Sequence, residues 1–134
     1  MENLFIEGTE LTPKVDFDLT TGVLEISGVS RPEDVLVFFD IPLDWIKTLI
    51  LAIGEDPSMA RQMHPLKLLF NMSYYNTSSS KYLIQLLKAL KKVMDHGIPL
   101  VVEWHYEEGD DKMKEDGEDL AEIVDMRFEY VEES

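Results

Sequence analysis

The chain has 134 residues, 45% of them hydrophobic and none cysteine, which predicts one globular domain over residues 1–134 and excludes disulfides, thiolate metal sites and a cysteine nucleophile. The formal net charge is −15, and the part from Glu103 onward, with fourteen acidic and three basic residues, carries −11 of it. Because such a surface repels phosphate groups, we expect neither nucleic acid nor an anionic membrane as a partner.

The start of the chain has no feature of an export signal. Met1-Glu2-Asn3-Leu4 lacks the basic residues and the long apolar core of a signal peptide. No stretch approaches the roughly 18 uncharged apolar residues that a membrane-spanning helix needs. We therefore expect a cytoplasmic protein.

The first elements are strands. Leu4–Ile6 is a short apolar run, and Val15–Asp18 alternates apolar and acidic residues. Val23–Ile26 follows after Leu19–Gly22, a four-residue link of turn-forming residues, so the pair predicts a β-hairpin. Gly28 is expected to end the second strand.

A first helix is predicted next, beginning at Ser30–Glu33, which has a hydroxyl, a proline in the first turn and a glutamate three residues after the serine. Pro42 predicts a kink or break near Asp40-Ile41. Gly54–Ser58 closes the helix, and Met59–His64 is expected to be an irregular connection. Apolar residues recur at helical spacing throughout: Val35, Phe38, Phe39, Ile46, Leu49, Ile50 and Ile53.

Leu66–Met72 is apolar at nearly every position, which is typical of a strand in the centre of a sheet. The strongest amphipathic helix pattern of the chain begins soon afterwards, at Lys81. Gly97 and Pro99 form its stop signal. Its apolar face comprises Leu83, Leu86, Leu87, Leu90, Val93 and Met94.

Between this strand and this helix lies Tyr74-Tyr75-Asn76-Thr77-Ser78-Ser79-Ser80-Lys81. Asn, Thr and Ser cap helices, but five of them in a row exceed what one cap needs. A helix N-terminus also favours an added anion, so a hydroxyl here is a candidate site for a phosphate. The alternative is a serine-rich loop that only caps the helix.

Three further elements complete the pattern. Pro99–Tyr106 predicts a strand, Glu107–Gly117 a charged loop that passes into a short helix ending near Val124, and Met126–Val131 a last strand. The predicted fold is α/β: a mixed sheet of five to six strands, with an N-terminal β-hairpin followed by right-handed β-α-β crossovers and about three helices.

Motifs of catalysis are missing, so we expect no enzyme, no cofactor and no metal. The chain has neither GxxxxGK nor GxGxxG, and no G-x-S-x-G surrounds its serines. Glu103, His105 and Glu107 would share one strand face. This pattern indicates a solvated surface rather than a metal site. Asp110–Gly117 lacks calcium-loop spacing and reads as a solvated turn. A small acidic metal enzyme using Glu103, His105 and Asp111 remains an alternative.

Several motifs of the chain belong together: Asn3–Thr9, Thr12-Pro13, Val15–Asp18, Thr21–Gly28, Leu43–Trp45, Tyr74–Lys81 and Val102–Tyr106, with the acidic segment that follows. In combination they resemble the SiaC family of bacterial regulatory phosphoproteins, over nearly the whole chain. The link from Gly54 to His64 is the main departure.

The resemblance implies a fold similar to the STAS domains of anti-sigma factor antagonists, which carry a phosphorylated serine at the start of the helix after a central strand. Thr77, in the equivalent place, is implied to be the phosphoacceptor, with Ser78, Ser79 and Ser80 next in line. The implied partners are a cognate kinase, a PP2C-type phosphatase and a diguanylate cyclase that the unmodified form activates.

Phosphate at Thr77 would add about −1.5 to −2 charges and three acceptor oxygens, with Lys81 as a counter-charge. A partner packed against this segment would have to desolvate that charge. The expected contact residues are Tyr74, Tyr75, Asn76, Ser78, Ser79, Ser80 and Lys81. An interaction module of the same fold that is never phosphorylated is the second alternative.

Overall fold

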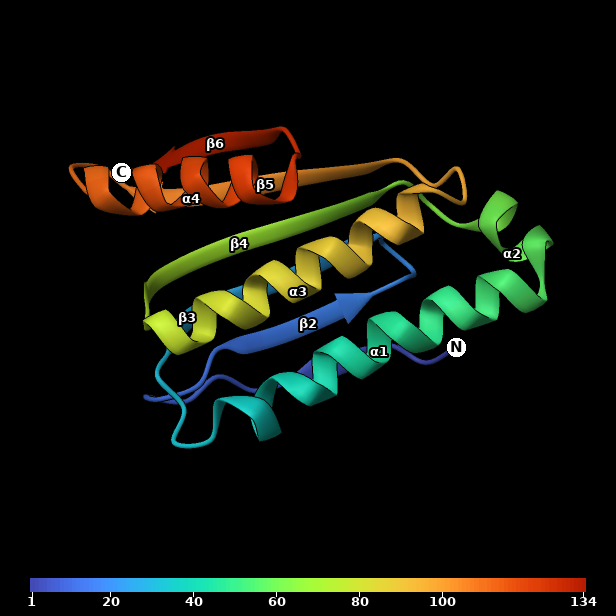
Figure 1. The fold of residues 1–134 in the computed structure, drawn as a ribbon, viewed down its shortest axis with the longest axis horizontal. Coiled ribbons are helices and arrows are strands. Elements are labelled where there is room, and N and C mark those ends of the chain that lie inside the picture. Colours follow the sequence, from blue (N-terminus) through green and yellow to red (C-terminus); the bar gives the residue numbers. More distant parts are fainter.

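A computed structural model describes the whole chain, Met1–Ser134. Six strands form one sheet in sequence order from β1 to β6, and the helices pack on one face of it (Figure 1). No helix combines the length and apolarity needed to span a membrane. The elements are β1 (Leu4–Ile6), β2 (Lys14–Asp18), β3 (Val23–Ser30), α1 (Val35–Glu55), α2 (Pro57–Gln62), β4 (Leu66–Tyr75), α3 (Thr77–Met94), β5 (Leu100–Glu107), α4 (Asp111–Val124) and β6 (Phe128–Glu133).

The sheet is mixed, as predicted. β1, β2 and β3 pair antiparallel, and β3 to β6 pair parallel. The β2–β3 hairpin is confirmed, and its turn places Gly22 at φ +82°, a conformation that glycine adopts without strain. The predicted end of β3 at Gly28 is wrong. The strand continues to Ser30, because a shift in register between Gly28 and Val29 absorbs the irregularity.

The parallel order brings three helix starts to one edge of the sheet. α1, α3 and α4 each follow the carboxyl end of a parallel strand, β3, β4 and β5 respectively. Their N-termini therefore lie along the same edge, with α3 between α1 and α4 (Figure 1). In open α/β sheets, ligands bind outside the carboxyl ends of the strands.

Trp104 of β5 fixes α4 against the sheet. The side chain is 1% exposed and packs against Phe70 and Phe128. Its indole N–H donates a hydrogen bond of 2.8 Å to the Met113 carbonyl oxygen of α4. Gly117, on the next turn of α4, lies so close that an added Cβ would be 2.6 Å from the indole ring.

The first helix starts later than predicted. Ser30 does not begin it, because that residue still belongs to β3 and its side chain is buried. Asp34 is the N-cap instead, and its carboxylate accepts a hydrogen bond of 3.1 Å from the Val37 amide. The break expected at Pro42 is also absent. α1 continues through the proline, which is buried on the face that packs into the core.

Two segments expected to be irregular are helical. Within Met59–His64, the residues up to Gln62 belong to α2, whose cap residue Asp56 accepts a bond from the Ser58 amide. The predicted charged loop from Glu107 to Gly117 is short, because α4 begins at Asp111 and passes through Gly117. Asp110 caps α4 by accepting the Met113 amide at 3.1 Å.

Candidate phosphorylation site at the start of α3

The start of α3 is tied to the end of β3. Asn76 is the N-cap residue, and its side-chain oxygen accepts a hydrogen bond of 2.8 Å from the Ser79 amide. The Asn76 amide donates to the Ser30 carbonyl oxygen at 3.0 Å. α3 thus begins at Thr77, four residues before the amphipathic pattern. The hydrogen bond to Ser30 fixes the start of the helix to β3, the strand beside β4.

Thr77 is the first residue of α3, and its side chain is exposed. The amides of the first helical turn have no carbonyl partner within the helix, and the helix dipole adds partial positive charge there. A phosphate on the Thr77 hydroxyl would therefore lie beside unpaired amides. A phosphoacceptor at this position has to be accessible and at the start of a helix, and Thr77 is both.

The three serines after Thr77 differ in accessibility. Ser78 is exposed and Ser80 is half-buried, with its hydroxyl donating to the Thr77 carbonyl oxygen at 2.7 Å. Ser79 is completely buried, and its hydroxyl lies 2.8 Å from that of Ser30. The structure leaves Ser79 no accessible hydroxyl for a partner or a phosphate, because its side chain is occupied in joining α3 to β3.

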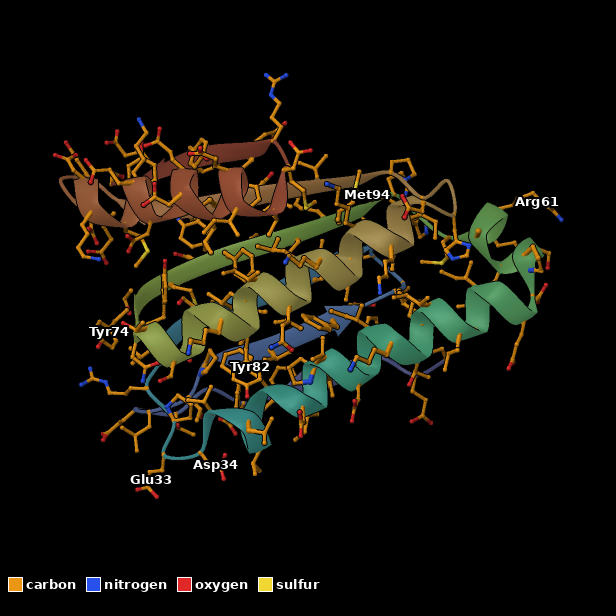
Figure 2. All side chains as sticks on the ribbon, viewed as in Figure 1. Glu33, Asp34, Arg61, Tyr74, Tyr82 and Met94 are labelled. Carbon is orange, nitrogen blue, oxygen red and sulfur yellow. The ribbon has the colours of Figure 1, made fainter.

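The two tyrosines also lie in different surroundings. Tyr74 is 45% exposed and projects at the end where α3 begins (Figure 2), with the Arg31 guanidinium 5.0 Å from its ring centre. Tyr75 is half-buried and meets the Trp104 ring edge-on. Burial raises the pKa of the Tyr75 hydroxyl, and the Asp116 carboxylate raises it further. Tyr74 is therefore the tyrosine that offers an aromatic surface to a partner.

A hollow of about 250 Å³ separates the start of α3 from α4. Its charged residues are Lys112, Asp116 and Asp119, and Lys112 pairs with Asp116 at 3.0 Å. The sequence does not predict that these three residues lie beside Thr77, because only the parallel order of β4 and β5 brings α4 next to α3. The complete lining is Tyr75, Asn76, Thr77, Ser80, Ile84, Lys112, Asp116, Asp119, Leu120 and Ile123.

Lys81, the expected counter-charge, does not line this hollow. It lies four residues after Thr77 on α3 with an exposed side chain, at the spacing that makes neighbours on a helix surface. Lys81 is therefore an unpaired cation for a phosphate on Thr77, whereas Lys112 is already paired with Asp116. Lys112 lies within the hollow and Lys81 lies along the helix.

The cap of α3 can be tested separately from phosphorylation. Replacing Asn76 with alanine should lower the free energy of unfolding by about 1 kcal/mol, because the Ser79 amide loses its acceptor. Urea denaturation of both proteins measures this difference. Asn76→Ser, which keeps a capping oxygen, should stay within a few tenths of a kcal/mol of the parent. Equal stability of the alanine and asparagine proteins would contradict the capping role.

On the open face of the sheet, His105 lies between two carboxylates. Its ring nitrogens are 3.1 Å from Glu103 and 2.5 Å from Glu133, and Glu103 also pairs with Lys67 at 3.1 Å. The hydrogen bond from His105, together with Lys67, lowers the pKa of the Glu103 carboxyl. Asp111 starts α4, among the helices, and no group of three His, Cys, Asp or Glu side chains is placed to hold a metal ion.

The fold and the site define a small α/β protein with an accessible hydroxyl at a helix start, beside an exposed tyrosine and a shallow charged hollow. Residues 6–133 match the SiaC family, which is described as a family of regulatory phosphoproteins. The chain belongs to the SiaC family.

Similar proteins of Pseudomonas aeruginosa agree with this assignment. An uncharacterized protein of strain UCBPP-PA14 is 32% identical over 128 residues, covering 96% of this chain and 94% of the relative. The structure of SiaC is 30% identical with a TM-score of 0.76, covering 98% of this chain and 97% of that one. A structure of the diguanylate cyclase SiaD in complex with its activator SiaC matches at 30% identity with a TM-score of 0.78, covering 96% and 97%.

Proposed function

We propose that this protein is a bacterial regulatory phosphoprotein in which reversible phosphorylation of Thr77 controls binding to an effector protein. The observation that carries the proposal is the contrast within one helical turn. Thr77 is exposed at the first position of α3, whereas Ser79 is completely buried. Of the remaining hydroxyls, Ser78 is the nearest exposed competitor.

The effector that we propose is a diguanylate cyclase, which the unphosphorylated form binds and activates. The support is the similarity to SiaC, described as the activator of the cyclase SiaD in the complex of the two. Activation would raise the concentration of cyclic di-GMP. The role of this chain is then regulatory, and the chemistry belongs to its partners.

A phosphate at Thr77 would block the partner through local charge. The hollow beside Thr77 already contains two carboxylates against one ammonium, and phosphorylation adds about −1.5 to −2 charges. A partner that covers Thr77 and Tyr74 would have to remove water from this charge without supplying a counter-ion. The isolated chain avoids that cost, because water and the first amides of α3 solvate the phosphate.

Reversibility requires a cognate kinase that adds the phosphate and a PP2C-type phosphatase that removes it. Both would act in the cytoplasm on the same exposed edge. Neither enzyme requires the fold to open, because the Thr77 side chain is accessible in the folded chain.

The proposal is tested on protein taken from its native cell and run on a phosphate-affinity gel. A phosphoprotein should give two bands, and treatment with a PP2C-type phosphatase should convert the retarded band into the other. A single band under all growth conditions, unchanged by phosphatase, would favour the alternative of an interaction module that is never phosphorylated.

A further inference from the structure

α3 is a basic helix in an acidic protein. It contains Lys81, Lys88, Lys91 and Lys92 and no carboxylate, although the chain as a whole has 27 acidic and 12 basic residues. Lys91 has a structural role, because its ammonium donates to the Val124 and Asp125 carbonyl oxygens at 3.1 Å at the end of α4. The other three have no such partner.

These lysines are aligned with Thr77. Thr77, Lys81, Gln85, Lys88 and Lys92 are spaced by three or four residues, which places all five on one face of a helix. α3 lies between α1 and α4 (Figure 1), and all five of these side chains are exposed. At 1.5 Å per residue, the line from Thr77 to Lys92 extends over about 22 Å.

A fourth lysine, from α1, joins the line. Lys47 lines a groove of about 180 Å³ together with Lys88 and Lys92, and the rest of its lining is Leu43, Gln85 and Ala89. No carboxylate lines this groove. We call Lys47, Lys81, Lys88 and Lys92 the lysine stripe.

The lysine stripe differs from four of the other five lysines of the chain in having no carboxylate partner. Lys14, Lys67 and Lys112 each lie within 3.1 Å of a carboxylate oxygen. No lysine of the stripe has a carboxylate oxygen within 4 Å, and all four side chains are exposed. Lys88 and Lys92, four residues apart on one helix, repel each other. An occupant with negative charge would relieve that repulsion.

We propose that the lysine stripe is a docking surface for an acidic segment of the effector protein. The groove is too small and shallow to enclose a ligand of ordinary size, whereas a row of ammonium groups over one helix fits carboxylates spaced along a helix or an extended segment. Asp95 and Asp125 flank the C-terminal end of the stripe. Those carboxylates and the net charge of −15 oppose a nucleic acid, which would extend past them.

The stripe also explains how phosphate at Thr77 opposes binding, an inference that rests on the proposed function. Thr77 stands at the head of the stripe, four residues before Lys81. A phosphate there pairs with the first lysine and repels an acidic segment that approaches the others. The switch then acts through competition for the same positive charges.

The test uses the full chain and an oligoglutamate peptide, followed by amide chemical shifts at low ionic strength. The shifts should change along Lys81, Lys88 and Lys92 and at Lys47. The double variant Lys88→Glu/Lys92→Glu should bind the peptide about tenfold more weakly, because two attractions become repulsions. Lys88→Arg/Lys92→Arg should bind like the parent. The control Arg61→Glu/Arg127→Glu makes the same change in net charge at exposed positions outside α3 and should also bind like the parent.

Three results would overturn the inference: no binding of the peptide, equal weakening in the arginine-to-glutamate control, or tighter binding of an oligodeoxythymidine than of the peptide. Chain carrying phosphate on Thr77 should bind the peptide severalfold more weakly, and equal binding would remove the link to the switch. Peptide binding does not depend on a kinase, so the two proposals can fail separately. If the phosphate-affinity gel shows that the chain is never phosphorylated while the peptide still binds at the lysine stripe, the proposed function is overturned and the docking surface remains.

Discussion

Thr77→Ala should abolish phosphorylation of this protein by its cognate kinase. Thr77 is exposed at the first position of α3, where unpaired amides and the helix dipole favour a phosphate. The alanine side chain has no oxygen to accept the phosphoryl group, so incorporation should fall from about one phosphate per chain to the background level. Incubation with the kinase and labelled ATP, followed by intact-protein mass spectrometry, measures the phosphate content.

Ser78→Ala is the matched control, because Ser78 is the adjacent exposed hydroxyl on the same helical turn. It should be phosphorylated to the same extent as the parent. The reverse pattern, with a phosphorylated Thr77→Ala protein and an unmodified Ser78→Ala protein, would move the acceptor to Ser78. Phosphate on the buried Ser79 would require the contact between its hydroxyl and that of Ser30 to open.

Trp104→Ala should lower the free energy of unfolding by about 4 kcal/mol, the largest expected effect of a single core substitution. The side chain is 1% exposed, fills the space between β5 and α4, and holds the Met113 carbonyl oxygen at 2.8 Å. Its removal leaves a cavity and an unpaired carbonyl oxygen. Chemical denaturation monitored by circular dichroism measures the loss.

Trp104→Phe separates the hydrogen bond from the packing. Phenylalanine keeps most of the aromatic contact with Phe70 and Phe128 but cannot donate to Met113. We expect a loss of about 2 kcal/mol, combining the missing hydrogen bond with a smaller cavity. A loss as small as that of a surface substitution in either variant would contradict the role of Trp104 in holding α4.

Much of the fold is predictable because its signals are local. The alternation in Val15–Asp18, the turn at Leu19–Gly22 and the apolar spacing of α3 each involve residues within one element. The mixed sheet with its N-terminal hairpin follows from them and is confirmed. The start of α1 was predicted wrongly from a local signal of equal strength. The Ser30 hydroxyl bonds with that of Ser79 in the folded chain, and Asp34 caps the helix instead.

The errors around α4 arise from a tertiary contact. Gly117 within a charged sequence predicts a loop. In the fold it lies against Trp104, where a side chain with a Cβ would clash with the indole ring. A glycine costs a helix about 1 kcal/mol relative to alanine, and here the close approach of the indole requires it. Sequence spacing carries no information about that neighbour.

Only part of the candidate site could be predicted, because the rest depends on tertiary contacts. The position of Thr77 after a central strand and at a helix start can be derived from local pattern and from the family resemblance. The burial of Ser79 and the presence of Lys112, Asp116 and Asp119 beside Thr77 depend on how β3 and α4 pack around α3. Those contacts join residues far apart in the sequence.

The central claim is that charge added at Thr77 expels a partner from an otherwise unchanged surface. The most direct measurement is the affinity of the proposed diguanylate cyclase partner for the unmodified chain and for the chain phosphorylated at Thr77, by titration calorimetry under one buffer condition. Burying the added charge at the interface costs about 2–5 kcal/mol, so phosphorylation should weaken binding by about thirtyfold to several thousandfold. Equal or tighter binding of the phosphorylated chain would contradict the account.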